Sequence, residues 1–600
     1  MRHPLFFLER NDDMKRLLVS LATVMLAACS AIDKSGSTHA AISWQPWSDA
    51  AFEAAKRERK LVLLDLGAVW CHWCHVMDRE TYGDPEVAKY VGEHFIAIHV
   101  NQDERPDLAN RYEDYGWPAT ILFAADGTEL GKFRGFMPPK RLLALFGAFV
   151  ADPTPGPSAL GREPVAAADA ILPRDLDNGL HGAWEAAYDR KEQGWGSVLK
   201  YLDPDCVELA MAEGRDDMAR GTLDAMLQLI DPVWGGVYQY SHGGVWTNPH
   251  FEKIMSFQAE DMRIYALAHR VYGDEKYLRA ARDIERYLLE FLRSPDGAFY
   301  ASQDADLIQG EHSGEYFALA DAGRRARGLP RIDTHLYARE NGWAVAALAS
   351  LSRASGDPST LKAAVQGATW VLKYRGTRIP MIDNEPSRTI VRHDGADSWG
   401  QYLADALAFA RACIELSQAT GDDSWISVAI GSLSSIRETF RSTNGYVTAA
   451  SLQSPLPPLP QVDENIGIAR LASRVFHLTG DKQWKEMAEH AMKYLAGVAR
   501  DANGVRAAGI LLAAREFASE PVKVVVVGDP GDQLTEWLLR AARSAPATWL
   551  VVSRVDPGAS AEYVQDGGVP TAYVCTDAAC NGPFHDPEAL RKAASPPRRR

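Results

Sequence analysis

The chain has few cysteines, little positive charge and no apolar segment of membrane-spanning length near its N-terminus. Only 7 of its 600 residues are cysteine, which is too few for a disulfide scaffold of this size. A net charge of −15 argues against a nucleic acid partner, because phosphate binding requires a basic surface. The apolar run at residues 17–26 is too short to cross a bilayer as a stable helix.

The composition is that of a large globular protein. Hydrophobic residues make up 46% of the chain and charged residues 24%. These proportions are typical of globular domains. Six hundred residues exceed the usual size of one domain, so we expect several domains.

The N-terminus has the pattern of an export signal. Two basic residues precede the apolar run, and the Leu-Ala-Ala-Cys sequence ending at Cys29 resembles a bacterial lipobox, in which the cysteine is lipidated. We predict a lipoprotein-type signal peptide over residues 1–29, export to the bacterial cell envelope or periplasm, and membrane attachment through a lipid on Cys29. A plain signal peptide with an incidental cysteine is the alternative, and either Met1 or Met14 is the start.

Residues 42–152 alternate helical and strand patterns. Strands are predicted at 61–66, 95–100, 119–123 and 132–136, and helices at 51–60, after Cys71 and at 141–150. This order is typical of an α/β thioredoxin-like fold. The proline-containing residues 153–164 that follow are predicted to be a linker.

Residues 165–515 consist mainly of amphipathic helical segments with an irregular repeat. A helix ends at a Gly-Asp pair, a second helix follows, and a loop with glycine and an aromatic residue comes next; the Gly-Asp pairs begin at 273, 356, 421 and 480. The unequal spacing disfavours a regular solenoid and predicts a closed ring of helical hairpins, an (α/α)6 barrel, with long loops on one face. Residues 521–592 return to a small α/β segment, so the fold class is multidomain.

The feature with the clearest chemistry is a pair of cysteines at a predicted strand-to-helix junction. Cys71 and Cys74 are three positions apart, a spacing that closes a disulfide across the first helical turn. The free amides and positive dipole of a helix N-terminus favour a thiolate on the first cysteine. We therefore expect Cys71 to attack and Cys74 to resolve, with His72, Trp73 and His75 as modulators.

Two neighbouring positions support a redox role. Asp65 is on the preceding strand, where a buried acid has a raised pKa and can accept the proton of Cys74, and His99 is placed to reach it. Pro118 precedes a strand at the position where thioredoxin folds place a cis-proline beside the disulfide.

These motifs resemble a known family. The sequences that carry the resemblance are Cys71-His72-Trp73-Cys74-His75, Gly116-Trp117-Pro118, Pro249-His250-Phe251-Glu252-Lys253, Gln303-Asp304-Ala305-Asp306 and Pro570-Thr571-Ala572-Tyr573-Val574-Cys575. They are similar to the spermatogenesis-associated protein 20 family, which implies a thioredoxin-like domain before a barrel like those of N-acylglucosamine 2-epimerases and six-hairpin glycosidases. The sequence departs from the family pattern at Glu340 and at residues 463–467, which puts a barrel activity carried over from the family in doubt.

Other readings of the cysteines remain open. C-x-x-C-H is also the attachment motif of c-type haem, but here it is embedded in a strand-to-helix turn. Zinc needs two further ligands and the chain has no second C-x-x-C, so we expect neither metal nor haem and no cofactor beyond the disulfide. An inert structural disulfide is the remaining alternative. Cys575 and Cys580 are expected to form a second disulfide, structural or in electron exchange with the first.

Five barrel residues are candidates for a second site: His250, Glu252, Lys253, Asp304 and Asp306. We expect the first three near the start of a helix at 257–270, with His250 and Lys253 on one face, and the two aspartates in a loop. Paired carboxylates suit glycoside hydrolysis, and a histidine suits proton transfer at a sugar carbon. A buried salt-bridge network is the plainer reading.

The sequence is therefore consistent with three functions. The first is a cell-envelope thiol-disulfide oxidoreductase acting on protein thiol or disulfide clients with an unidentified electron donor. The second is a carbohydrate-active barrel enzyme with an accessory thioredoxin domain. The third is a non-catalytic binding protein. Tryptophans at 184, 195, 234 and 246 suit either sugar stacking or core packing.

Overall fold

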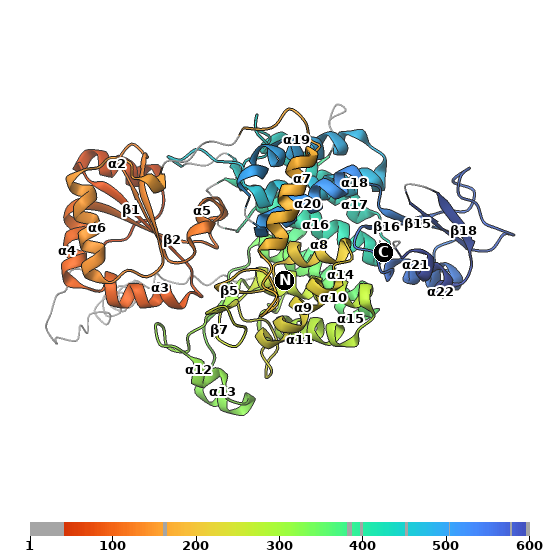
Figure 1. The fold of residues 1–600 in the computed structure, drawn as a ribbon, viewed down its shortest axis with the longest axis horizontal. Helices are drawn as coiled ribbons and strands as arrows, with labels where there is room; N and C mark the ends of the chain where they lie inside the picture. Colours follow the sequence, from red (N-terminus) through yellow and green to blue (C-terminus); the bar gives the residue numbers. More distant parts are fainter. Residues whose placement is uncertain are drawn as a thin grey trace, which may run out of the picture. The chain divides into compact units, whose positions relative to one another are not determined.

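The computed structural model describes residues 41–159, 165–380, 387–395, 400–450, 454–502, 504–576 and 579–595. The predicted signal peptide, Cys29 and linker residues 160–164 lie outside the described residues. From Ile42 onward the chain forms one compact unit (Figure 1). Within the described ranges, no helix combines the length and the apolarity needed to cross a bilayer.

The first region is a thioredoxin-like fold. Its sheet has the strand order β2-β1-β3-β4, with β1 parallel to β2, antiparallel to β3, and β3 antiparallel to β4. Its elements are α2 (Asp49–Glu58), β1 (Leu61–Gly67), α3 (His72–Met77), α4 (Pro85–His94), β2 (Phe95–Asn101), α5 (Pro106–Tyr112), β3 (Ala119–Phe123), β4 (Glu129–Arg134) and α6 (Pro139–Ala151).

Both faces of this sheet are buried, because strand residues alternate between two hydrophobic clusters. Leu64 of β1 packs with Phe52 of α2 on one face, whereas Leu63 packs with Phe146 of α6 on the other. The fourth strand was predicted at 132–136 but occupies Glu129–Arg134. The turn at Asp126-Gly127 is tight, and Ala124 N–H bonds to Thr128 O at 2.8 Å, so the returning strand begins directly after it.

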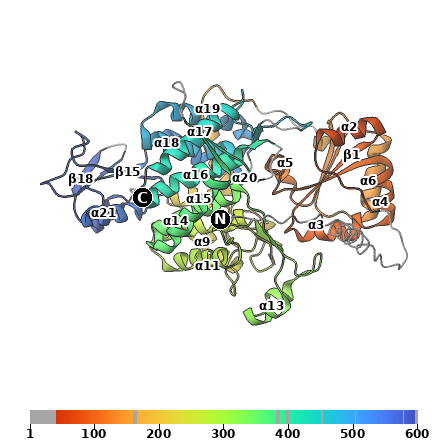
Figure 2. The same ribbon diagram turned by 180° about the vertical axis from the view of Figure 1, so that it is seen from behind.

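The second region is the predicted α/α barrel. Among the described helices, six inner helices contact one another in a closed ring, and each packs chiefly against one outer helix (Figures 1 and 2). The inner helices are α8 (Pro204–Ala212), α10 (Met255–Tyr272), α14 (Ala338–Ser355), α16 (Leu403–Thr420), α18 (Val462–Thr479) and α20 (Gly504–Ala518). The outer helices are α7 (Arg174–Ala186), α9 (Asp216–Met226), α11 (Glu275–Phe291), α15 (Pro358–Tyr374), α17 (Ser424–Thr439) and α19 (Lys482–Val498).

The Gly-Asp repeat is the junction between an inner helix and its outer partner. Gly273 ends α10 in the left-handed conformation, at φ 68°, and Asp274 caps the N-terminus of α11 through Lys276 N–H. The pairs at 356 and 480 have the same arrangement. A glycine adopts this φ without Cβ strain, and the aspartate satisfies a free amide, so the pair reverses the chain tightly.

Short strands between the helices hold the loops over the inner-helix starts. β8 (Lys253–Ile254), β9 (Ser302–Gln303) and β10 (Ile332–Asp333) form a three-stranded sheet in the order β10-β9-β8. This sheet places the Glu252 and Asp304 segments side by side, because Lys253 is paired with Gln303.

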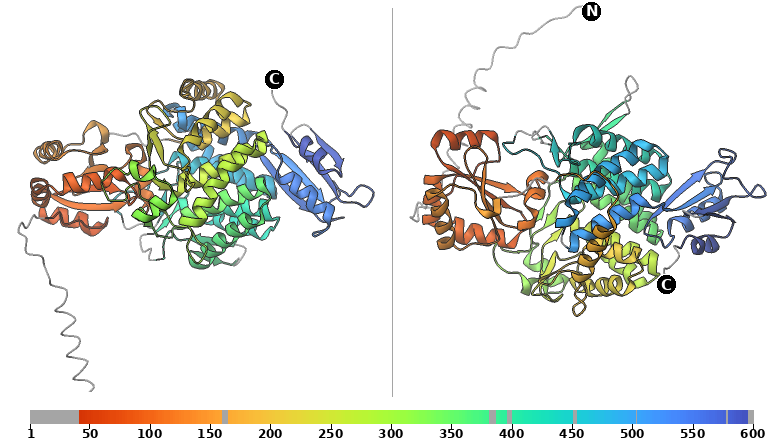
Figure 3. Two further views of the ribbon diagram at one scale, coloured as in Figure 1. Left: turned by 90° about the horizontal axis from the view of Figure 1, so that it is seen from below. Right: turned by 45° about the horizontal axis from the view of Figure 1, so that its top comes forward.

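The third region repeats the topology of the first. Its sheet has the order β16-β15-β17-β18, with β15 parallel to β16, antiparallel to β17, and β17 antiparallel to β18 (Figure 3). The elements are β15 (Val522–Val527), α21 (Gln533–Arg543), β16 (Leu550–Val555), β17 (Thr571–Cys575), β18 (Cys580–Phe584) and α22 (Pro587–Ala593). The loop after β15 has no cysteine where the first region has its pair.

Candidate functional site

The predicted cysteine pair forms a disulfide at the start of α3. Cys71 is the N-cap residue, and its sulfur accepts a hydrogen bond from the backbone N–H of Cys74 at 3.1 Å. Both cysteines are buried, at 4% and 6% exposure, whereas Trp73 between them is 41% exposed. A helix N-terminus stabilises negative charge, so this position favours a thiolate on Cys71 when the disulfide is open.

A cis peptide bond precedes Pro118, at the position expected from the sequence. Trp117, on the other side of that bond, packs against the hydrophobic cluster that contains Cys71 and Cys74. Trp70 belongs to the same cluster, and its indole N–H donates to Asp103 Oδ2 at 2.9 Å. The disulfide is therefore enclosed by aromatic side chains from two loops of its own domain.

Asp65 is buried and bonded through both carboxylate oxygens. Tyr82 donates to Oδ1 at 3.2 Å, and His99 Nδ1 contacts Oδ2 at 2.9 Å, which is the contact expected from the sequence. Burial lowers the pKa of His99, but the hydrogen bond and charge of Asp65 outweigh it and raise that pKa. A methyl group placed on Gly67 would lie 3.5 Å from Cys74 Sγ and 3.7 Å from His99 Cε1. His99 and Cys74 therefore both lie next to Gly67.

The two aspartates predicted for a separate barrel site contact the histidines of the Cys71–Cys74 motif instead. Asp306 Oδ1 lies 2.7 Å from His72 Nδ1, and Asp304 Oδ2 lies 2.9 Å from His75 Nε2. Asp304 and Asp306 are buried, at 1% and 2% exposure. Burial lowers the pKa of His75, but the hydrogen bond and charge of Asp304 exceed that effect and raise the pKa. The barrel thus supplies a carboxylate to each histidine of the Cys-His-Trp-Cys-His sequence.

Glu252 is a third barrel acid at this motif. Its Oε1 accepts the backbone N–H of His72 at 3.4 Å, whereas its buried Oε2 has no hydrogen-bond partner among the described residues. Burial raises the pKa of Glu252 to about 7. His250 Nδ1 lies 3.9 Å from Oε2, and burial together with nearby histidines lowers the pKa of His250 to about 4. The pair is thus a neutral imidazole beside a carboxyl group that ionises near neutrality.

Lys253 does not belong to this group, and the predicted helical face shared with His250 is wrong. The segment is extended, because it forms β7 (Pro249–His250) and β8, and α10 begins only at Met255. Lys253 Nζ is fully buried 2.8 Å from Asp231 Oδ2, which also binds Arg324. The plainer reading, a buried salt-bridge network, therefore applies to this lysine.

One group of described side chains has the spacing to hold a metal ion. Ligand atoms of His75, Asp304 and Asp306 lie within 4.8 Å of one another. Each carboxylate is already an acceptor: Asp304 Oδ1 takes the backbone N–H of Asp306, and Asp306 Oδ2 takes that of Gly310. Hydrogen bonding to the two histidines accounts for the arrangement.

The Cys71–Cys74 motif borders a large cavity in the barrel. Ile254 packs in the same cluster as Cys71 and Cys74, and Phe257 and Trp117 pack against that cluster. All three line the cavity, whose volume is about 860 Å³. Thioredoxin-domain residues and the first turns of inner helices line it, as do the last turns of inner helices and residues 548–550 of the C-terminal region. The disulfide is one layer of side chains from this space.

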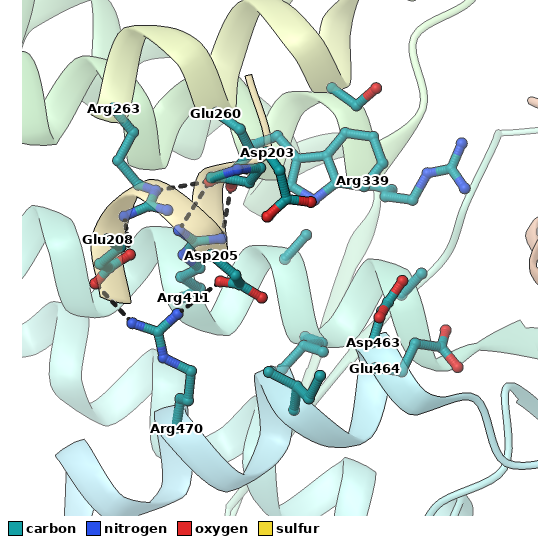
Figure 4. A pocket seen from close by; sticks show the side chains of 18 of the residues that line it. Asp203, Asp205, Glu208, Glu260, Arg263, Arg339, Arg411, Asp463, Glu464 and Arg470 are labelled. Atoms are coloured by element: carbon teal, nitrogen blue, oxygen red, sulfur yellow. Dashed lines mark hydrogen bonds and ion pairs between the residues drawn. The ribbon is translucent and has the colours of Figure 1, made fainter. Parts of the chain in front are cut away.

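Charged side chains from the inner helices line the cavity. Arg263 joins Glu208 at 2.8 Å and Glu260 at 2.7 Å, and Arg470 joins Glu208 at 2.7 Å and Asp205 at 3.1 Å (Figure 4). These acids and arginines were not singled out from the sequence. They lie in helices where charged residues alternate with apolar ones. This pattern predicts a solvent-exposed helix face, and only the closed ring of helices buries it.

A second set of cavity acids is poorly compensated. Burial raises the pKa of Asp203 to about 7 and that of Glu464 to about 8, and neighbouring acids add to both shifts. Glu113 of the thioredoxin domain, whose pKa burial raises to about 7, adds its charge to the same group and pairs with Arg506. Figure 4 shows Asp203, Asp463 and Glu464 around one open space. The Asp463-Glu464 departure from the family pattern was the one signal in the sequence.

The remaining described cysteines and the four tryptophans lie in the C-terminal sheet and the barrel. Cys575 and Cys580 form a disulfide across the β17–β18 hairpin, and Cys206 and Cys413 are buried free cysteines whose pKa burial raises. The four tryptophans considered for sugar stacking are buried in the barrel core, each 2% exposed or less: Trp184, Trp195, Trp234 and Trp246.

Comparisons with known proteins agree with this architecture. Residues 33–144 match the family Thioredox_DsbH, described as "Protein of unknown function, DUF255". Human spermatogenesis-associated protein 20 is 22% identical over 720 residues, an alignment covering 92% of this chain and 90% of the human protein. Thiol:disulfide interchange protein DsbD 1 of Pseudomonas aeruginosa is 34% identical over 89 residues, which are 14% of this chain and 15% of that protein.

A solved cellobiose 2-epimerase from Bacillus thermoamylovorans aligns with the structure at a TM-score of 0.40 and 10% identity, covering 54% of this chain and 87% of that one. The resemblance inferred from the motifs is thus confirmed by sequence similarity along nearly the whole chain. This chain is a relative of spermatogenesis-associated protein 20 over 92% of its length, with a Thioredox_DsbH domain in front of an α/α barrel.

Proposed function

We propose that the protein is a thiol-disulfide oxidoreductase whose active disulfide is Cys71–Cys74. The observation that carries the proposal is a disulfide capping the N-terminus of α3, next to the cis-proline loop, with both motif histidines held by buried carboxylates. In the oxidising direction a client dithiol gains a disulfide while Cys71 and Cys74 become two thiols. The reverse reaction transfers two electrons and two protons to a client disulfide.

In this mechanism Cys71 forms the mixed disulfide with the client and Cys74 resolves it. The helix N-terminus and the His72 and His75 imidazoles stabilise the Cys71 thiolate. The Cys74 proton leaves through His99, which faces Gly67 together with Cys74 and is backed by Asp65 at 2.9 Å. Asp65, the residue expected to take the proton, is joined to this imidazole at Nδ1 and also accepts from Tyr82.

The barrel controls access to the disulfide. Ile254 and Phe257 cover the two cysteines, and the contacts to His72 and His75 hold the cover in place. A protein client reaches Cys71 only when these contacts open, whereas a small thiol has a shorter route through the cavity side. We further propose that the reaction takes place in the bacterial cell envelope, with Cys29 as the lipid anchor.

The test is a redox titration read by mass spectrometry. The purified protein is equilibrated over a graded glutathione series, its thiols are alkylated, and peptides carrying each cysteine pair are weighed. The Cys71–Cys74 peptide should gain two alkyl groups reversibly, at a potential that shows whether the protein reduces or oxidises its clients. In Cys71→Ser the reversible transition should vanish.

The Cys575–Cys580 pair is an internal control, because it is measured separately in the same digest. If the Cys71–Cys74 peptide never opens across the series, or if Cys71→Ser retains dithiol activity toward a model substrate, the proposal fails. A haem-sized mass on the peptide would also contradict it, since that mass identifies the C-x-x-C-H sequence as a haem attachment site.

A carbohydrate-active barrel is the second candidate function. It is favoured by one observation: carboxyl groups with pKa values near 7 and 8, Asp203 and Glu464, face a cavity large enough for a disaccharide. An acid that is protonated near neutrality is what a glycosidic leaving group requires. Turnover of a sugar that is lost in Glu464→Gln but kept in Cys71→Ser would establish this activity, and its retention in Glu464→Gln would exclude the assigned acid.

A further inference from the structure

Three arginines meet in the cavity at the last turns of the inner helices. Arg270 comes from α10, Arg353 from α14 and Arg474 from α18. Glu415, in the last turns of α16, lies between two of them: Arg353 Nη1 is 2.9 Å from Glu415 Oε2, and Arg474 Nη1 is 2.5 Å from Glu415 Oε1. All four side chains line the cavity, and we call them the arginine cluster.

The arginine cluster has too little negative charge. One carboxylate faces three guanidinium groups, and the nearest other acids are engaged elsewhere, because Glu208 and Glu516 bind Arg470 at 2.7 and 2.9 Å. Among the described residues, no carboxylate binds Arg270, which donates to the Ala545 carbonyl at 3.3 Å. Burial, with Arg353 next to it, lowers the pKa of Arg270 to about 9. A buried charge without a partner is strongly destabilising.

The cluster also has unused hydrogen-bond donors. The Nε–H groups of Arg270, Arg353 and Arg474 are buried and have no acceptor among the described residues. Arg270 and Arg353 are more than nine-tenths buried. Helix C-termini favour nearby cations, but their carbonyl groups do not accept these three N–H groups. Buried donors in native proteins normally have partners, so the cluster lacks an acceptor.

We propose that the arginine cluster is the binding site for an oxyanion, the phosphate or carboxylate group of a small ligand held in the barrel cavity. Such a group supplies the negative charge that the three guanidinium groups lack. It also supplies several acceptor oxygens for the N–H groups of the planar guanidinium side chains. Thr548, Trp549 and Leu550 of the C-terminal region line the same end of the cavity. This region therefore forms part of the binding site.

The test uses inorganic phosphate as the probe, with acetate in parallel as the carboxylate. Each anion is titrated into the full chain in chloride-free buffer, and the heat of binding is measured by calorimetry. The midpoint of thermal unfolding is recorded separately at each anion concentration. We expect saturable binding of one or both anions and a rise in the midpoint with anion concentration. The anion that binds identifies the source of the charge. In Arg270→Met the affinity should fall at least tenfold.

Two variants distinguish an anion-binding site from an ion-pair network that only stabilises the fold. Without anion, Arg270→Met should unfold at the same or a higher temperature than the wild type, because it removes an unpaired buried charge. Arg411 lines the same cavity and forms an ion pair with Glu260 at 2.7 Å. Arg411→Met breaks this pair, so it should lower the midpoint of thermal unfolding but keep the rise in midpoint on anion binding. No saturable binding of either anion, or an unchanged response in Arg270→Met, would overturn the proposal.

Discussion

Glu252 is a single residue at which the fold opposes the usual ionisation of a carboxyl group. Burial raises its pKa from the ordinary 4.5 to about 7, and its Oε2 has no partner among the described residues. Because the folded pKa is the higher one, the folded state holds this proton more tightly than the unfolded state. The stability that depends on the proton is complete below pH 4.5 and is lost as the pH rises towards 7.

Glu252→Gln should therefore stabilise the protein at alkaline pH. Glutamine keeps an oxygen for the His72 N–H and cannot ionise, so the variant avoids a cost that reaches about 3 kcal/mol above pH 7. Its advantage over the wild type should grow by roughly 2 kcal/mol between about pH 5.5 and pH 8, measured by denaturant unfolding at each pH. A constant difference between the two proteins across that range would show that Glu252 is ionised throughout.

At the scale of elements, the β17–β18 hairpin is closed by the second disulfide. Cys575 and Cys580 are paired directly across the two strands, five positions apart in sequence. A loop this short restricts the unfolded chain only modestly, by about 2 kcal/mol. The disulfide therefore stabilises one edge of the C-terminal sheet and has no need to open during the proposed reaction.

The double variant Cys575→Ser/Cys580→Ser should weaken this hairpin locally. Hydrogen exchange at β17 and β18 should become faster, with a loss of about 2 kcal/mol in local opening free energy. The reversible alkylation of Cys71 and Cys74 should be unchanged. A coupled change in the potential of the first pair would instead indicate that the two disulfides exchange electrons.

For the whole molecule, the main consequence of the fold is that a barrel loop contacts the Cys71–Cys74 motif. Asp304 and Asp306 arrive on a barrel loop far along the chain from the histidines they bind, at sequence separations of 229 and 234. Hydrogen bonds to a charged group contribute about 1.5–3 kcal/mol each. In the proposed reaction, breaking these two contacts is the step that exposes the disulfide to a protein client.

Asp304→Asn/Asp306→Asn should speed reduction of the Cys71–Cys74 disulfide by a protein dithiol about tenfold or more, since each weakened contact favours the open form. Reduction by a small phosphine should change much less. Stopped-flow kinetics with both reductants measures the ratio. The exposed Glu311, in the same loop region, provides the matched control Glu311→Gln. Equal acceleration by both reductants would mean that the carboxylates tune the disulfide itself and not its accessibility.

Much of the molecule was determined by local sequence alone. Strand 119–123 and the Gly-Asp helix junctions follow from the side-chain period, the φ freedom of glycine and the capping of free amides by aspartate, which act over a few residues. The cysteine spacing, the helix start and the cis-proline position are local in the same sense, so the amino-acid sequence by itself predicts a cysteine pair at a helix start beside a cis-proline.

The features that only the tertiary structure decides are contacts that form when the ring of inner helices closes. The partners of His72 and His75, the enclosure of the disulfide by Ile254, and the arginine cluster join segments from different hairpins. Sequence periodicity tells which side of a helix is apolar, but not which charged residues meet inside a closed barrel. Desolvation in that interior shifts ionisation and leaves donors without acceptors, and it exists only when all six inner helices are in place.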